Sequence, residues 1–190
     1  DQVAGLRTDQ ITAFSTSQIT GLSTDGIAAL TTSQAAVLSL AQMTMLGSAQ
    51  VAAFETEDLR SITTQALRGM TSAATAALTS DQIQALTTSQ TLALTSTQIR
   101  ALGSDQIIAL STDQFAVLST AQVAAMTTAQ VQAIDSGDIA SLGSANLRAL
   151  NTAQVRALGS EQVQGLSTAQ AAALTSTQTA AMTTNQVAAL

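Results

Sequence analysis

The chain has 190 residues, a formal net charge of −6 and only 9% charged residues, and it contains no Cys, His, Lys, Pro, Trp or Tyr. These absences remove the material for Ser-His and Cys-His nucleophiles, Schiff-base lysines, disulfides and His or Cys metal sites. Six basic residues argue against a nucleic-acid surface built on Lys and Arg. We therefore expect a protein that is not an enzyme, without catalytic, cofactor-binding or metal-binding residues.

The hydrophobic content indicates an ordered, soluble chain. Apolar residues make up 46% of the sequence, whereas disordered chains combine low hydrophobicity with high net charge. No apolar run approaches the roughly 18–20 residues that span a bilayer, so we expect no membrane insertion. There is no Met at position 1 and no signal peptide, which predicts a processed product or an excised piece.

An eight-residue repeat runs without interruption from Asp1 to Leu190, giving about 24 octads in a single array over 1–190. Position six of the octad is apolar in all 24 octads, position three is mostly Val or Ile, and position five is small. Position two is Gln in 18 octads, and positions seven and eight are rich in Ser and Thr. Such a fixed period is typical of repeat architectures.

Each octad is predicted to form one short helix. A continuous helix is disfavoured because eight residues advance about 800°, so an apolar stripe drifts about 80° per repeat. A strand is disfavoured because the apolar positions do not alternate. Position seven holds preferred N-cap residues and the Gln of position two follows three residues later, which is the capping-box pattern, as in Ser15-Thr16-Ser17-Gln18.

Two further features agree with this assignment. Leu118 and Val123 flank the cap Ser119 at the spacing of a hydrophobic staple, and the same spacing recurs along the chain. Eight of the twelve acidic residues lie at position one, near the predicted helix start, and five of the six Arg lie at position four, nearer its end. Both placements complement the helix dipole.

Helices of about six residues do not form alone in water, so neighbouring octads must stack. We therefore predict an all-α solenoid of very short helices that buries positions three, five and six, with small residues at position five letting backbones approach closely. The number of octads per coil stays open, because no second period of 16 or 24 residues is visible.

Two stretches depart from the octad. In Glu55–Thr75, position two becomes Asp58, Ala66 and Ala74, and charged residues gather there. A carboxylate site for a cation such as calcium is one interpretation; surface ion pairs, for example Glu57 with Arg60, are the favoured one. A second stretch, Asp135–Asn146, also loses Gln.

Repeated side chains suggest two further interpretations. Stacked Gln could form an amide ladder along the array, although capping of its own helix already accounts for the spacing. Rows of Thr could order water, but Ser, Thr and Gly interchange there, which favours a role in caps and corners.

The two ends carry no capping repeat, because the first octad and the final residues both match the consensus. Solenoids normally need polar caps. The sequence therefore predicts either an excerpt of a longer array or ends that stack head-to-tail on other copies, which gives a filament if the contact does not close.

The recurring Leu-Thr-Thr-x-Gln-Val-x-Ala-Leu pattern resembles octapeptide tandem-repeat regions of large bacterial secreted and surface proteins. This resemblance implies a bacterial, extracellular or cell-surface, structural setting and transfers no functional residue. We predict a subunit or segment of an extracellular filament, with other copies of itself as partner. The alternatives are a monomeric spacer or stalk of a giant adhesin, and an ice-binding or protein-binding repeat surface.

Overall fold

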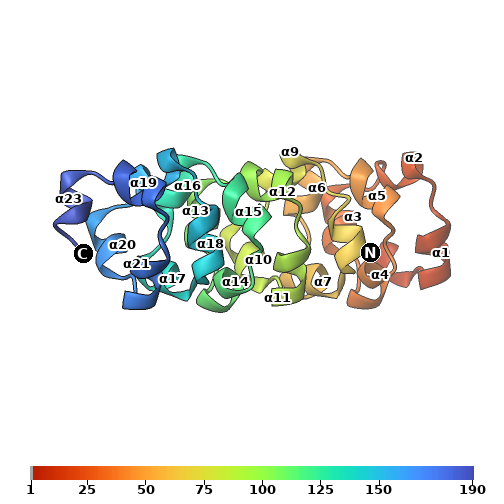
Figure 1. Ribbon diagram of the computed structural model, residues 1–190. Coiled ribbons are helices and arrows are strands. Elements are labelled where there is room, and N and C mark those ends of the chain that lie inside the picture. Colours follow the sequence, from red (N-terminus) through yellow and green to blue (C-terminus); the bar gives the residue numbers. More distant parts are fainter. Residues whose placement is uncertain (1) are drawn as a thin grey trace. The chain divides into compact units, whose positions relative to one another are not determined.

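The computed structural model describes residues 2–190 and falls into two compact units, residues 1–101 and 102–190. The described part of each unit consists of short helices joined by extended corners (Figure 1). The first unit holds η1 (Val3–Gly5), α1 (Thr8–Ala13), α2 (Thr16–Ile19), α3 (Thr24–Ala28), α4 (Thr32–Ala36), α5 (Leu40–Met45), α6 (Ser48–Ala52), α7 (Thr56–Ser61), α8 (Thr64–Leu67), α9 (Ser72–Ala76), α10 (Ser80–Ala85), α11 (Thr88–Ala93) and α12 (Ser96–Ala101). The second unit holds α13 (Ser104–Ile108), α14 (Thr112–Ala116), α15 (Thr120–Ala125), α16 (Thr128–Ala133), α17 (Ser136–Ser141), α18 (Ser144–Ala149), α19 (Thr152–Ala157), α20 (Ser160–Gln164), α21 (Thr168–Ala173), α22 (Ser176–Ala181) and α23 (Thr184–Val187).

The helices begin where the capping pattern predicts. At α15 the Ser119 hydroxyl accepts a hydrogen bond from the Gln122 backbone N–H at 3.3 Å, and the Gln122 side-chain oxygen accepts one from the Ser119 N–H at 2.8 Å. Where Gly occupies the cap, as at Gly47, only the second bond remains, from its N–H to Gln50 Oε1 at 2.9 Å. Among the described helices, none has the length and apolar character needed to cross a membrane.

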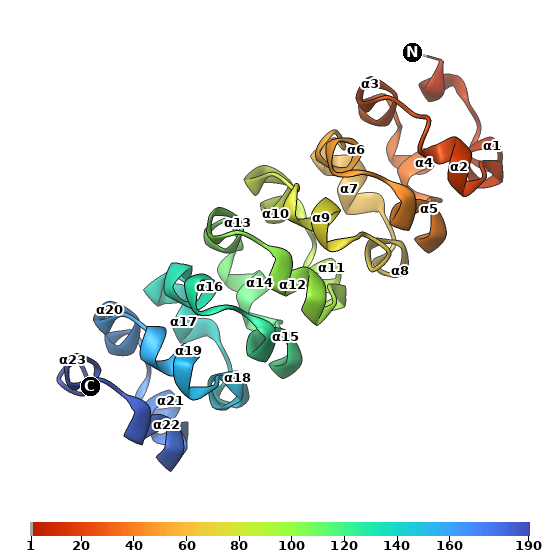
Figure 2. The same ribbon diagram turned by 90° about the horizontal axis from the view of Figure 1, so that it is seen from above.

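Within each unit, a helix packs on the helix three places further along the chain. In the first unit α4 packs on α7, and in the second α14 packs on α17, as the views of Figures 1 and 2 also show. Because each octad contributes one helix, three octads, or 24 residues, complete one coil. The prediction of an all-α solenoid with one helix per octad is therefore confirmed, and the open question of octads per coil is answered.

The core is built from positions two, three and six, so part of the predicted core was wrong. Leu118 and Val123, the predicted staple residues, are both buried, as positions three and six are through most of each unit. Position five is only half-buried in most octads, whereas the Gln of position two is almost fully buried except at Gln2, Gln10, Gln18 and Gln50. The reason is that position five lies at the end of each helix, beside a corner, while the Gln side chain lies between coils.

Position five still has the predicted role of permitting close approach. A Cβ added to Gly69 would clash with the Leu40 carbonyl oxygen, and one added to Gly165 would lie 2.8 Å from the Ser136 carbonyl oxygen. Ser61 occupies the equivalent place, and its hydroxyl donates to the Thr32 carbonyl at 2.8 Å. The end of each such helix therefore lies against the first turn of the helix three places earlier.

Candidate functional site: the intercoil glutamines

The most regular polar feature of both units is the Gln of position two, which bonds at both ends of its amide. In α11, Gln90 Oε1 accepts from the Thr87 backbone N–H at 2.9 Å and completes the cap of its own helix. Its Nε2 donates to the carbonyls of Leu59 and Ile62, at 2.9 and 2.8 Å. These carbonyls lie 31 and 28 residues earlier, at the end of α7 in the preceding coil.

The same pair of offsets recurs through both units. Further examples with both bonds are Gln34, Gln42, Gln50, Gln82 and Gln98 in the first unit and Gln162, Gln170, Gln178 and Gln186 in the second. Each amide thus joins its own cap to a corner of the coil before it. An individual intramolecular hydrogen bond contributes about 0.5–1.5 kcal/mol net, so the repeated set is a substantial part of the stacking energy.

The structure decides between the two interpretations of the repeated Gln. The amides cap their own helices, as the milder interpretation requires, but they also link successive coils. The links run from amide to backbone carbonyl, and the ladder predicted between stacked Gln side chains is replaced by this amide-to-backbone pattern. The capping box predicted the first bond, and no feature of the sequence identified the acceptors of the second.

The first irregular stretch places a carboxyl where Gln normally donates. Asp58 is 5% exposed at the start of α7. Burial raises the pKa of the Asp58 carboxyl, and the neighbouring Glu55 and Glu57 carboxylates raise this pKa further. Ala66 and Ala74, at the next two position-two sites, carry no amide at all.

Neither chemical interpretation of this stretch is supported by the geometry. In the described part of the chain, no group of three or more acidic side chains is arranged to hold a metal ion, so the calcium hypothesis is not supported. The predicted Glu57–Arg60 ion pair is also wrong. The ion pair found in residues 2–190 joins Arg7 to Asp9 at 3.0 Å on the surface, where such pairs contribute little.

The second irregular stretch keeps part of the intercoil function with shorter side chains. Asn146 Nδ2 donates to the Leu118 carbonyl at 2.7 Å, which is the 28-residue bond that a Gln makes. Asp138 cannot donate when ionised, and it accepts instead from the Thr112 hydroxyl at 2.8 Å. Burial raises the pKa of Asp138, the Thr112 bond opposes this rise, and Asp135 adds to it.

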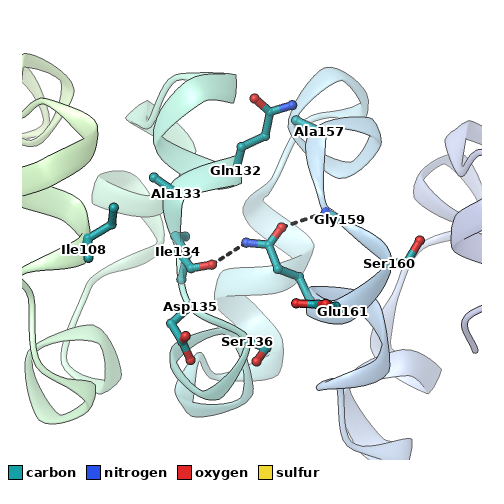
Figure 3. Close-up of a pocket in the computed structure, with 11 residues that line it drawn as sticks. Ile108, Gln132, Ala133, Ile134, Asp135, Ser136, Ala157, Gly159, Ser160 and Glu161 are labelled. Atoms are coloured by element: carbon teal, nitrogen blue, oxygen red, sulfur yellow. Dashed lines mark hydrogen bonds between the residues drawn. The ribbon is translucent and has the colours of Figure 1, made fainter.

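An open pocket of about 660 Å³ lies in the second unit beside the corners that precede α17 and α20 (Figure 3). Two hydrogen bonds of Gln162 are drawn within it, from the Gly159 N–H to Oε1 at 2.7 Å and from Nε2 to the Ile134 carbonyl at 2.6 Å. Asp135, also in the lining, accepts from the Gly137 N–H at 2.7 Å and so caps α17. The polar lining of this pocket therefore includes a group that caps a helix, Asp135, and a group that links two coils, Gln162.

The Ser and Thr hydroxyls of positions seven and eight differ in role. Those at position seven accept backbone N–H groups as caps, as Thr31 does from Gln34 N at 3.3 Å. Those at position eight are mostly exposed at the first residue of each helix. Position-eight residues of helices that stack on one another form a row within each unit. Because each coil adds one helix layer, neighbours in this row are expected to lie about 8–10 Å apart, the usual distance between packed helices.

Gln10 and Gln18 make only the cap bond within residues 2–190, because positions 28 and 31 residues before them would precede residue 1. Near the start, Gln10 and Gln18 cap their helices through Oε1, but within the described residues their Nε2 groups reach no acceptor. Near the end, Gln186 donates to Val155 and Leu158, and no described Gln side chain reaches the carbonyls of the later corners. Val187 and Leu190 are 53% and 63% exposed there.

Comparison with known proteins identifies the repeat. The model of the ALTTAQ repeat matches residues 3–48, 51–88, 92–120, 109–133 and 131–168, which together span most of the chain. No curated protein matches the chain. The motif stands in this sequence as Ala85-Leu86-Thr87-Thr88-Ser89-Gln90. In structural terms it contains the small corner residue, the core Leu, the cap, the first helical turn and the intercoil Gln.

Proposed function

The chain belongs to the ALTTAQ repeat family, and on that premise we propose that it is a structural protein, a subunit or segment of a filament built by end-to-end stacking. The observation that carries this proposal is the amide link between coils. It uses a backbone carbonyl as acceptor, so any coil that presents a free corner can receive another coil.

The length of the helices supports the same role. Helices of four to six residues are far below the length that is stable alone in water, so each coil depends on its neighbours. Stacked repeats of this kind gain stability from the interfaces between them. A surface coil with exposed apolar residues, such as Val187 and Leu190, therefore gains free energy when another coil covers it.

We place the filament outside a bacterial cell. The support is the resemblance of the octapeptide pattern to repeat regions of large bacterial secreted and surface proteins. The second candidate is a monomeric spacer or stalk of an adhesin. A stiff stack of coils would suit this role without any contact between chains.

Negative-stain electron microscopy of the purified 190-residue protein separates the two candidates. We expect fibres of uniform width that lengthen with protein concentration. Val187→Glu, which places a charge on the exposed C-terminal coil, should shorten them. The matched control is Ile108→Glu, because Ile108 is 62% exposed on α13, away from both ends. Single particles of one size at high concentration would contradict the filament and favour the spacer.

A further inference from the structure

Two eight-residue segments, one in each unit, share the same three departures from the repeat. Residues 55–62 read Glu-Thr-Glu-Asp-Leu-Arg-Ser-Ile, and residues 135–142 read Asp-Ser-Gly-Asp-Ile-Ala-Ser-Leu. In both, an acidic residue replaces the usual cap, Asp replaces the intercoil Gln, and Ser occupies position five. Elsewhere in the sequence position seven is never acidic, position two is never Asp, and position five is never Ser. The three changes therefore occur together.

We propose that Asp58 and Asp138 are proton-operated links between coils. As a carboxylic acid, each side chain donates a hydrogen bond to the backbone carbonyl 28 residues earlier. As a carboxylate, it cannot donate, and the link is lost. These contacts lie inside each unit, so the proposal applies to a filament and to a monomeric spacer alike.

Asn146 shows that a side chain of this length reaches such an acceptor. Its Nδ2 donates to the Leu118 carbonyl, 28 residues earlier, at 2.7 Å. Asn and Asp side chains have the same length, and Asp138 occupies the same octad position one repeat before Asn146. A protonated carboxyl at position two can therefore make the bond that the Asn146 amide makes.

The acceptors at this offset are the carbonyls of Leu30, for Asp58, and Leu110, for Asp138. Leu30 lies in the corner before α4 and Leu110 in the corner before α14, and α7 and α17 pack on these two helices. Within residues 2–190, neither carbonyl accepts a hydrogen bond. An ionised Asp beside such a carbonyl brings two acceptors together, whereas a protonated Asp supplies the donor.

Hydroxyl groups keep both segments attached to the preceding coil when the carboxyl is ionised. In the first unit, Ser61 Oγ donates to the Thr32 carbonyl at 2.8 Å. In the second, the Thr112 hydroxyl donates to Asp138 Oδ1 at 2.8 Å, which leaves Oδ2 to carry the proton. Loss of the carboxyl bond therefore weakens the contact without separating the coils.

The surroundings of Asp58 favour its protonated form. Its side chain is 5% exposed, and Glu55 and Glu57 lie close to it in sequence. Of the helices packed on α7, α10 carries Asp81 and α4 carries no ionisable residue. Arg60, on α7 itself, forms no ion pair within the described chain. Burial raises the pKa of Asp58, and the carboxylates of Glu55 and Glu57 raise it further.

Asp138 has a similar environment, in which α17 and the helices packed on it carry no basic residue. Asp135 caps α17, and the packed helices α14 and α20 carry Asp113 and Glu161. Burial raises the pKa of Asp138, the Thr112 bond lowers it, and Asp135 raises it. For a carboxyl whose pKa is raised on folding, the stabilisation is present at low pH and is lost as pH rises through that pKa.

Hydrogen exchange of the whole chain, measured over a pH series and divided by the intrinsic rate at each pH, tests the links. From about pH 7 to about pH 4, a range that contains raised carboxyl pKa values, protection of α4 with α7 and of α14 with α17 should rise. We expect a rise of about 2–10-fold, as one net hydrogen bond implies. The pair α16 and α19, joined through Gln154, is the internal control and should show no such rise.

Variants separate a hydrogen bond from the simple burial of a charge. Asp58→Asn and Asp138→Asn donate at every pH, so protection should be high and independent of pH. Asp58→Ala and Asp138→Ala remove both donor and charge, and their protection should stay low throughout. Asp81→Asn and Asp113→Asn, at exposed position-one residues, are the matched controls and should keep the rise of the wild type.

Carbon-13 NMR of the carboxyl groups follows proton uptake in the wild-type chain and requires no substitution. Asp58 and Asp138 should titrate at higher pH than exposed Asp81, and protection of the two helix pairs should follow these titrations. The proposal is overturned if protection does not follow them, or if both carboxyls titrate together with Asp81. It is also overturned if the Asn variants are protected no better than the Ala variants, since burial of a charge alone predicts that result.

Discussion

Replacement of Gln90 by Ala removes one buried amide that joins two coils of the first unit. Gln90 is 2% exposed, donates to Leu59 and Ile62 and accepts from Thr87. The substitution removes all of these bonds without adding bulk or charge. It therefore measures the interaction on which the stacking argument depends.

The magnitude follows from the groups left behind. Loss of the cap bond to the Thr87 N–H costs about 0.5–2 kcal/mol. Leu59 O keeps its bond from the Ile62 N–H, but Ile62 O, buried between coils, loses its amide donor. An unsatisfied buried acceptor costs about 1–3 kcal/mol. The expected local destabilisation is therefore about 2–5 kcal/mol.

Hydrogen exchange measured by mass spectrometry is the suitable assay, because stacked repeats open locally and a global midpoint would average over coils. Protection should fall in α7 and α11 together, since the amide joins them. Thr87→Ala, which removes the hydroxyl half of the same cap, should cost about 0.5–2 kcal/mol and affect mainly α11. A Gln90→Ala variant no less protected in α7 than Thr87→Ala would refute the intercoil role.

Three further changes are expected to alter stability in defined directions. Asp58→Asn should reduce the pH dependence of stability. The Asp58 pKa is raised on folding, so the wild type gains stability as pH falls through that pKa and loses it toward neutral pH. In urea unfolding the variant should show a smaller slope against pH, since buried Asp138 keeps its own contribution, whereas exposed Asp81→Asn should keep the full slope. Gly69→Ala should destabilise by about 1–3 kcal/mol because its Cβ meets backbone. Gly143→Ala lies in open space at the N-cap of α18, so in the same unfolding experiment it should cost no more than about 1 kcal/mol, the effect of Ala at a cap. Asn146→Gln should stabilise by about 0.5–1.5 kcal/mol by adding the second intercoil bond, read as a higher midpoint in urea.

The helices could be predicted from the sequence because a cap is a local device. Ser119 and Gln122 satisfy each other's backbone N–H groups within four residues, and this requires no knowledge of the fold. The staple residues Leu118 and Val123 are likewise defined by spacing alone. Helix starts at position eight, acidic residues in the first turn and Arg near the end all follow from this local chemistry.

The burial of Gln90 could not be predicted in the same way. A polar residue at the start of a short helix is expected at the surface, and its second set of partners lies 28 and 31 residues away. Those partners are backbone carbonyls, which no residue type marks. The burial of position five was overestimated from the sequence. Its small residues suggested a place in the core, but small size also permits close approach at a half-buried corner, as at Ser61.

The same chemistry explains why the 24-residue coil leaves no trace in the sequence. A period appears in a sequence when particular side chains must meet, as in a coiled coil whose partners select each other's charges. Here the amide of one octad meets a main-chain oxygen, and position five meets another main-chain oxygen, so the three corners of a coil impose the same requirement. Each octad therefore meets its requirement without a matched side chain on another octad, and eight residues is the period that the sequence shows.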